Sequence, residues 1–265
     1  MKKVLKAIGI LLLILLILIV AVIIVIRIFA SKNNRVMNET IDKGMAIVRE
    51  NYNVKELDAG EYKDMRFYGI MKFHVDQYEV ETLGNLSVMT ADMGFMQMVS
   101  FLITPYEKNL PVCTLDYMYI FGTRKSYTEF YNLAGDANGS DYQTVNAELL
   151  KMVGRYSDIE ELKVDPHWYD VYLDAVMHKQ LSSSEDARNQ DMFCDALRTY
   201  LEASKNAEAA SPEVQKIQLE KTQNYCDGLI EKGGVSTDVF KQALGEDKTH
   251  DFFDRVFFGT ALYRD

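Results

Sequence analysis

The chain has 265 residues, of which 48% are hydrophobic and 26% are charged, a composition typical of a globular protein with one sizeable core. Residues 1–35 carry six positive charges and no negative ones, which leaves −16 on the other 230 residues because the net charge is −10. That acidic balance argues against nucleic acid or an anionic membrane surface as the main partner. Three widely spaced cysteines form no CxxC pair and no evident disulfide framework, so we expect them to be small core residues: Cys113, Cys194 and Cys226.

The first predicted element is a membrane-spanning helix. Residues 7–26 contain no charge and match the roughly 20 apolar residues that a bilayer span needs. The run is longer than the roughly 7 to 15 apolar residues of a cleavable signal peptide, so we expect an uncleaved single-pass anchor over residues 1–30. Three positive charges flank the run on each side, so the positive-inside rule gives almost no orientation. The short N-terminal tail favours a domain outside the cytoplasm.

A short basic linker at 31–35 and a helix at 36–52 are expected next, within a connecting region that ends at residue 64. From residue 65 the pattern changes to alternation of apolar and polar residues, which indicates strands. Short polar connections between these runs predict an antiparallel meander. The expected strands are 66–80, 86–90, 95–104, 112–121 and 126–133.

Helices follow the strands in the rest of a domain that we place at residues 65–265. Ser184 and Ser236 are candidate N-caps, and Pro212 is expected to start a helix near Ser211 that ends at Gly233-Gly234. A block of strands followed by a block of helices predicts an α+β fold, with enough helices to cover both faces of the sheet. The expected helices are 147–162, 169–180, one from Ser184, 212–232, 239–244 and 247–258.

Asp116 is the residue that points most directly to chemistry. It lies in the middle of the 112–121 strand, whose two faces are both mainly apolar, as in a sheet covered on both sides. For a carboxyl to donate a proton near neutral pH, its pKa must rise from about 3.9 to near 7, which burial can cause. The alternative is that Asp116 lies in a loop and bonds backbone amides or an arginine.

Other candidates have equally ordinary explanations. His74 could share a proton with Asp116 if the two strands present them on one face; otherwise it is a solvent-side histidine. Asp170, Asp174 and His178 fall at i, i+4 and i+8 of the expected 169–180 helix, as a metal or acid cluster or as a solvated stripe. Met93 with Phe95 and Phe101 could border a pocket for a flat apolar ligand, or fill the core. Our ligand-binding candidates are Met96, Met98, Ser100, Thr114 and Met118.

Two regions of the chain carry a resemblance to a known family. Residues 96–105, MQMVSFLITP, continue into LPVCTLD at 110–116, and the tail contains residues 218–224, FKQALGE at 240–246 and FFDRVFF at 252–258. With the order of elements, the chain from about 65 to 258 resembles the ferredoxin-dependent bilin reductases and, more distantly, the red chlorophyll catabolite reductases. Val99 stands where some members have a histidine, and a second acidic residue of the family could be Asp186, Asp191 or Asp195.

The resemblance implies an α/β/α sandwich, with a central antiparallel sheet between two helical layers and a linear tetrapyrrole between the sheet and the C-terminal helices. It implies that Asp116 is the proton donor, that no flavin or metal is bound, and that an external ferredoxin supplies electrons one at a time. We therefore expect a membrane-anchored, bilin-reductase-like protein, which as a reductase would face the cytoplasm. The alternative is a non-catalytic, membrane-anchored binding or scaffold domain with the same fold.

Overall fold

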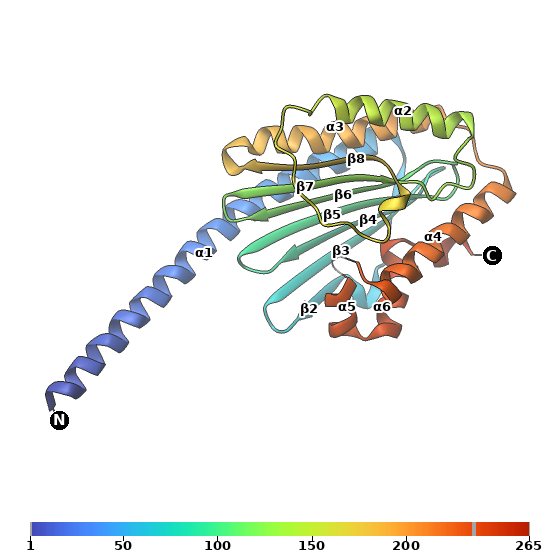
Figure 1. Ribbon diagram of the computed structural model, residues 1–265. Helices are drawn as coiled ribbons and strands as arrows, with labels where there is room; N and C mark the ends of the chain where they lie inside the picture. The colour runs from blue at the N-terminus through green and yellow to red at the C-terminus, as the bar shows by residue number, and fades with distance from the viewer. Residues whose placement is uncertain (1, 235–236, 265) are drawn as a thin grey trace.

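The computed structural model describes residues 2–234 and 237–264. Over these residues the chain forms an antiparallel sheet between two layers of helices, and one long N-terminal helix projects from this domain (Figure 1). The fold class expected from the sequence is therefore confirmed. The strands are β1 (Val54–Leu57), β2 (Asp64–Phe67), β3 (Met71–Val80), β4 (Gly84–Asp92), β5 (Met96–Pro105), β6 (Val112–Ile120), β7 (Thr123–Tyr131) and β8 (Leu173–Ser182).

The sheet is a meander from β3 to β8, in the order β1-β3-β4-β5-β6-β7-β8, and β2 also pairs with β3. Strands β4 to β7 agree with the four predicted runs from 86 to 133. The predicted strand at 66–80 is instead the hairpin of β2 and β3. It reverses at Tyr68 and Gly69, whose φ angles of 51° and 73° lie in the left-handed region.

The predicted helix at 169–180 is wrong, because most of that segment is strand β8, paired with β7 from Thr123 to Tyr131. Its buried residues follow a period of two, at Ala175, Met177, Lys179 and Leu181. This period-two burial is that of a strand with one face in the core. Asp170, Asp174 and His178 therefore do not lie on one face of a helix, and their i, i+4, i+8 spacing does not bring them together. The preceding helix, α2 (Ser140–Gly154), starts seven residues earlier than the predicted 147.

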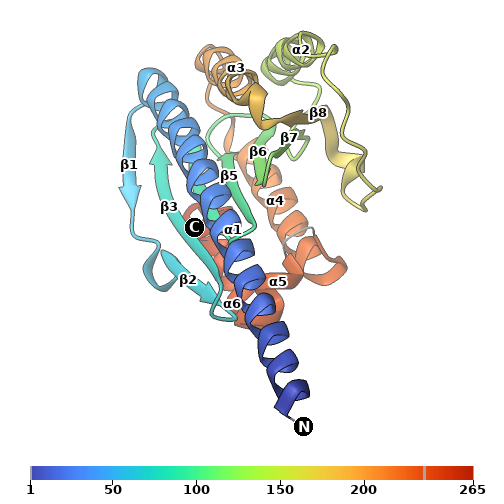
Figure 2. The same cartoon turned by 90° about the vertical axis from the view of Figure 1, so that its left-hand side faces the viewer.

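Helices cover the two faces of the sheet separately. The C-terminal half of α1 (Lys2–Asn51) lies with α2 and α3 (Asp186–Lys205) on one face. The other face carries α4 (Pro212–Lys232), α5 (Thr237–Leu244) and α6 (Glu246–Phe252), which continues into a π-helical turn (Figures 1 and 2). Helix α4 starts at Pro212 as predicted, and the side chain of its N-cap Ser211 accepts a hydrogen bond from the Val214 amide at 3.4 Å. The predicted cap at Ser236 lies outside the described residues.

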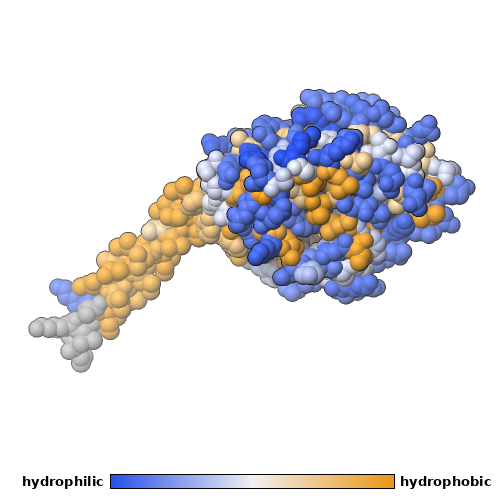
Figure 3. All heavy atoms as spheres, turned by 45° about the horizontal axis from the view of Figure 1, so that its top comes forward, coloured by the Kyte–Doolittle hydropathy of each residue, from blue (hydrophilic) through white to orange (hydrophobic). Residues whose placement is uncertain are grey.

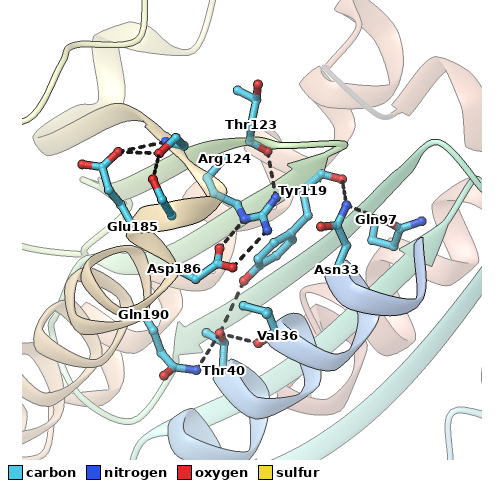
Figure 4. A network of polar contacts seen from close by, with 12 residues as sticks. Asn33, Val36, Thr40, Gln97, Tyr119, Thr123, Arg124, Glu185, Asp186 and Gln190 are labelled. Atoms are coloured by element: carbon cyan, nitrogen blue, oxygen red, sulfur yellow. Dashed lines mark hydrogen bonds and ion pairs between the residues drawn. The ribbon is translucent and has the colours of Figure 1, made fainter. Parts of the chain in front are cut away.

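Helix α1 is continuous, so the linker expected at 31–35 does not exist. Its segment from Ile8 is long and apolar enough to cross a membrane, and Figure 3 shows its hydrophobic surface projecting from a mainly hydrophilic domain. Asn33 is fully buried, and its amide donates to the Gln97 side chain at 3.1 Å and the Tyr119 carbonyl at 3.3 Å (Figure 4). The domain therefore begins inside α1, well before the expected boundary at 65.

The docked part of α1 yields the first testable prediction. A chain that begins at residue 31 is expected to fold, whereas one that begins at residue 53 is expected to aggregate, because it exposes the sheet face that α1 covers. Burying five apolar side chains stabilises by about 7–15 kcal/mol, comparable to the whole stability of a domain. Light scattering and circular dichroism of the two chains provide the test, and a folded, monomeric chain from residue 53 would contradict it. The five residues are Val36, Met37, Met45, Ile47 and Val48.

Candidate ligand cavity

A cavity of about 340 Å³ lies between the sheet and the C-terminal helices. Its volume is at the lower end of the roughly 300–1,000 Å³ range of small-molecule sites. One wall is the sheet, from β3 to β7, and the other consists of side chains from α4, α5, α6 and the segment before β8. Methionines dominate the sheet wall, and their flexible thioethers suit an irregular apolar ligand. These methionines are Met71, Met89, Met93, Met96, Met98 and Met118.

The register of β5 and β6 brings the predicted site residues to this wall. Met98 is opposite Met118, Ser100 is opposite Asp116, and Leu102 is opposite Thr114. All of these residues face the cavity, because directly opposite residues of an antiparallel pair share a face of the sheet. Met96 lines the cavity as well.

His74 does not join them. It pairs with Thr90, whose partner on β5 is Val99, so these three residues lie on the face opposite to Ser100 and Asp116. The imidazole is instead close to two carboxylates near the edge of the sheet, with Nδ1 at 2.8 Å from Asp64 and Nε2 at 3.2 Å from Asp76. The faces of His74 and Asp116 do not coincide, and the predicted sharing of a proton between them is therefore wrong.

Two aromatic residues suggested by the sequence also lie elsewhere. The Phe101 ring packs at 5.5 Å from Phe193 of α3, on the opposite face of the sheet. Phe95 is at the turn between β4 and β5 and is 49% exposed. The aromatic side of the cavity comes from C-terminal residues that the sequence did not single out for a ligand: Tyr225, Phe240, Phe252, Phe253, Phe257 and Phe258.

The environment of Asp116 favours the neutral acid. Burial is the main cause and raises the pKa of its carboxyl to about 7. The Ser100 hydroxyl acts in the opposite direction by donating a hydrogen bond, and the negative charge of Glu129 raises the pKa further. Asp116 lies in mid-strand, between Ser100 of β5 and Tyr127 of β7, so the alternative of a loop aspartate is excluded. Such a carboxyl can both donate and accept a proton near neutral pH.

Two further polar residues lie near the same site: Glu129, which the sequence did not single out, and His178, which the sequence suggested only as part of a cluster with Asp170 and Asp174. Glu129 lines the cavity, its Oε1 is 2.7 Å from Nε2 of His178, and Tyr131 donates its hydroxyl hydrogen to the other carboxylate oxygen. His178 is opposite Tyr127, which is opposite Asp116, so the three share one face. Recognition of 173–182 as a strand would have placed His178 there by the period of two.

The three candidates for a second acidic residue do not reach the cavity. Asp186 and Asp195 belong to α3 on the opposite face, where Asp186 pairs with Arg124 and Asp195 accepts a hydrogen bond from the Tyr156 hydroxyl at 2.8 Å. Asp191 belongs to the same helix. Glu129 is the second carboxylate that lines the cavity, on the strand next to that of Asp116.

Comparison with known proteins identifies the fold. No protein-family model and no curated protein sequence matches the chain. Among solved structures, phytochromobilin synthase from tomato in complex with biliverdin matches with a TM-score of 0.71 and 14% sequence identity, over 86% of this chain and 85% of that one. That protein is a ferredoxin-dependent bilin reductase, so the fold is the one that the sequence resemblance implied.

Proposed function

We propose that this chain is a membrane-anchored protein that binds a linear tetrapyrrole in the cavity, and that Asp116 protonates the ligand as it is reduced. The fold shared with a biliverdin-bound phytochromobilin synthase supports the class of ligand. One observation carries the chemistry: a mid-strand carboxyl on a methionine-rich wall, with its pKa raised to about 7. About half of such a carboxyl is protonated at pH 7, which suits a general acid.

The reaction that fits this site is the addition of two electrons and two protons to a conjugated double bond of the tetrapyrrole. We propose that the electrons arrive one at a time from an external, ferredoxin-type donor. Asp116 supplies one proton and is reprotonated from solvent, and the second proton comes from solvent water. The Glu129 charge keeps Asp116 protonated to a higher pH, and His178 and Tyr131 hold the Glu129 carboxylate in place.

The anchor limits which side of the membrane supports this chemistry. We propose that α1 crosses the bilayer, because its apolar segment is exposed and projects away from the domain (Figure 3). A ferredoxin-type donor is a cytoplasmic protein, so reduction requires the domain to face the cytoplasm. Accessibility of a C-terminal tag to protease in sealed vesicles distinguishes the two orientations.

Binding without reduction is the second candidate function, and Val99 favours it. Val99 is fully buried on the face opposite to Asp116, and the neighbouring positions that do face the cavity are Met98 and Ser100. Neither thioether nor hydroxyl titrates near neutral pH, so β5 offers no histidine to work with Asp116. A domain of this kind would carry a tetrapyrrole at the membrane without changing it.

The test uses the full chain in detergent or nanodiscs. Biliverdin is expected to change its visible absorption on mixing, and a reduced ferredoxin system is expected to bleach or shift that band in a second step. No spectral change on mixing would exclude tetrapyrrole binding. A change on mixing without a second step would leave the non-catalytic function.

The charge of Glu129 provides a further prediction. The Glu129→Gln variant is expected to lower the pKa of Asp116, because it removes a nearby negative charge, and to move the alkaline limb of the reduction rate to lower pH. Glu79→Gln is the matched control, since it removes a carboxylate from an exposed position on β3. Rates measured from pH 5 to pH 9 provide the comparison, and identical profiles for the two variants would contradict the role of Glu129.

A further inference from the structure

Three hairpins turn at the same end of the sheet, and each exposes a large apolar side chain there. They are the turns between β2 and β3, between β4 and β5, and between β6 and β7 (Figures 1 and 2). We call the four residues concerned the tip surface: Tyr68, Ile70, Phe95 and Phe121, which are 62%, 70%, 49% and 38% exposed. At the opposite end of the sheet the large apolar residues of the β3–β4 and β5–β6 hairpins are buried, namely Leu83, Tyr106 and Leu110, and Val171 before β8 is exposed. The asymmetry between the hairpins of the two ends marks one end of the sheet as a contact surface.

Helix α1 leaves the domain at this same end. The Phe29 ring packs edge-on against Phe121 at 5.7 Å, and the Asn34 amide donates to Asp92, the last residue of β4, at 3.2 Å. Both contacts tie the helix to the hairpins. Figures 1 and 2 show the hairpins directed toward the side from which α1 projects.

The length of the apolar run at residues 7–26 determines how far the end of the sheet with the tip surface lies from the hydrocarbon layer of the bilayer. Residues 7–26 form about 30 Å of helix, which equals the hydrocarbon thickness of a bilayer. Phe29 lies three residues further on, so its ring and the Phe121 ring are about 4.5 Å beyond the hydrocarbon boundary when the helix is upright. The polar layer on each side of the hydrocarbon is about 5–8 Å thick. The hairpin that carries Phe121 therefore reaches this layer without any bending of the helix, which has no glycine or proline from residue 10 to residue 43.

The backbone of two tip residues is an independent observation. Tyr68 and Phe121 have φ angles of 51° and 50°, a left-handed conformation that favours glycine, asparagine or aspartate and is unfavourable for an aromatic residue. The Tyr68 side chain is 62% exposed, so packing within the domain does not offset this cost there, whereas the Phe121 ring has one packing partner, Phe29. An aromatic residue held in a strained position on the surface indicates a contact outside the chain.

We propose that the tip surface inserts into the interfacial layer of the bilayer that α1 crosses. The inference rests on the membrane anchoring in the proposed function. Tyrosine and phenylalanine suit this layer, and cations nearby can reach lipid phosphates. Exposed cations flank the tips at Arg66 and Lys72 on β2 and β3, and at Arg27 and Lys32 on α1.

This placement also gives the cavity a route to the membrane. Met71 follows Ile70 directly, and Met93 and Met96 flank the turn that carries Phe95. These methionines are partly exposed, as are Val164 and His167 in the segment before β8, whereas Leu102 and Phe258 deeper in the cavity are buried. One opening of the cavity therefore lies beside the tip surface, and the ligand that enters there is an amphiphilic one that has already partitioned into the membrane.

The test places a single environment-sensitive fluorophore in the full chain in nanodiscs. Cys194, the partly exposed native cysteine, is first replaced by serine. The label is then attached at Tyr68→Cys or Phe95→Cys on the tip surface, at Glu81→Cys on the opposite end of the sheet, or at Ile19→Cys in the middle of the apolar run. Quenching by lipids with a spin label near the headgroup is compared with quenching by iodide in water.

Strong lipid quenching and weak iodide quenching at both tip positions, with the reverse at Glu81, is the expected result. Iodide quenching at the tips equal to that at Glu81 would overturn the inference, because the tips would then lie in water. A role of the tips in binding a soluble protein partner would give this same result. The Ile19 label distinguishes failure of the membrane anchor from failure of the proposed insertion of the tip surface. If that label is quenched by lipid while the tips are not, the anchor stands and the inference fails; if Ile19 is open to iodide, the anchor itself fails.

Ligand entry has its own readout. In the Tyr68→Ser, Ile70→Ser, Phe95→Ser variant, uptake of biliverdin that is offered in vesicles is expected to slow severalfold, whereas equilibrium binding in detergent stays unchanged. Unchanged uptake would overturn the entry route. If the unsubstituted chain does not bind biliverdin in detergent, the result would instead contradict the proposed function.

Discussion

The Asp116→Asn variant is expected to keep biliverdin binding and to lose reduction by about 10²- to 10⁴-fold, the usual contribution of a positioned general acid. The amide has nearly the same shape as the protonated acid, and the methionine wall around it is unchanged. It cannot transfer a proton to the ligand. Absorption titration measures binding, and single-turnover reduction with a chemically reduced ferredoxin measures the rate.

The unsubstituted chain is expected to lose activity as the pH rises through about 7, because the carboxyl that must donate then becomes ionised. Ser100→Ala is the matched variant, since it removes the hydroxyl that lowers the pKa of Asp116. Its alkaline limb is therefore expected to move to higher pH, opposite to the shift in Glu129→Gln. Reduction by Asp116→Asn at the full rate would contradict the role of Asp116 as proton donor.

The same raised pKa has a consequence for stability. Between about pH 4 and pH 7 the folded chain holds the Asp116 proton more tightly than the unfolded chain does, so the free energy of unfolding decreases as the pH rises through this range. Asp116→Asn, which cannot ionise, should match the parent near pH 4 and be more stable at pH 8. The difference is at most on the order of 4 kcal/mol. Urea unfolding of both chains in detergent at the two pH values would show it.

The second large effect is expected at the buried ion pair between Arg124 and Asp186. Arg124 has no exposed surface, its Nη2 donates to Asp186 Oδ2 at 3.2 Å, and its guanidinium lies over the Tyr119 ring at 5.0 Å (Figure 4). It also donates to the carbonyls of Phe121 and Thr123, and so connects α3 to the β6–β7 hairpin. Asp186→Ala leaves a buried guanidinium without its counter-ion.

Loss of such a partner typically destabilises by about 3–5 kcal/mol. The double variant Arg124→Met, Asp186→Leu is expected to recover most of that loss, because it removes both charges and keeps the volume apolar. Asp158→Ala serves as the surface control, because it breaks an ion pair in which the Asp158 side chain is 61% exposed and the Arg188 side chain is 44% exposed. Only a small change in the free energy of unfolding is expected for this variant. Equal effects of Asp186→Ala and Asp158→Ala on chemical unfolding would show that the buried pair is not special.

Much of the sheet could be predicted because short apolar runs separated by turn residues are a local property. Strands β4 to β7 are four such runs, and the polar turns between them identify their ends within a few residues. The cap at Ser211 and the start of α4 at Pro212 are local signals of the same kind. Strand β8 was misassigned because the i, i+4, i+8 spacing of its polar residues imitates a helix, while its burial depends on the neighbouring strand β7.

Part of the candidate site could be predicted for the same reason. The apolar pattern around Asp116 showed that a carboxyl was enclosed, and period two placed Thr114 and Met118 beside it. Ser100 and Asp116 meet because of the register between β5 and β6, which no local pattern determines. His74 was misplaced by one face for the same reason: the faces of two strands are related only through the register of the strands between them.

By itself, the sequence determined the apolar N-terminal segment, the layered α+β fold and the position of Asp116 in an enclosed strand, because each depends on local periodicity and composition. Only the tertiary structure decided that Glu129 and His178 stand on the face of Asp116, that α1 is one helix from its apolar segment into the core, and that the hairpin tips gather where it leaves the domain. These depend on register and packing between segments far apart in the chain, where burial decides the outcome.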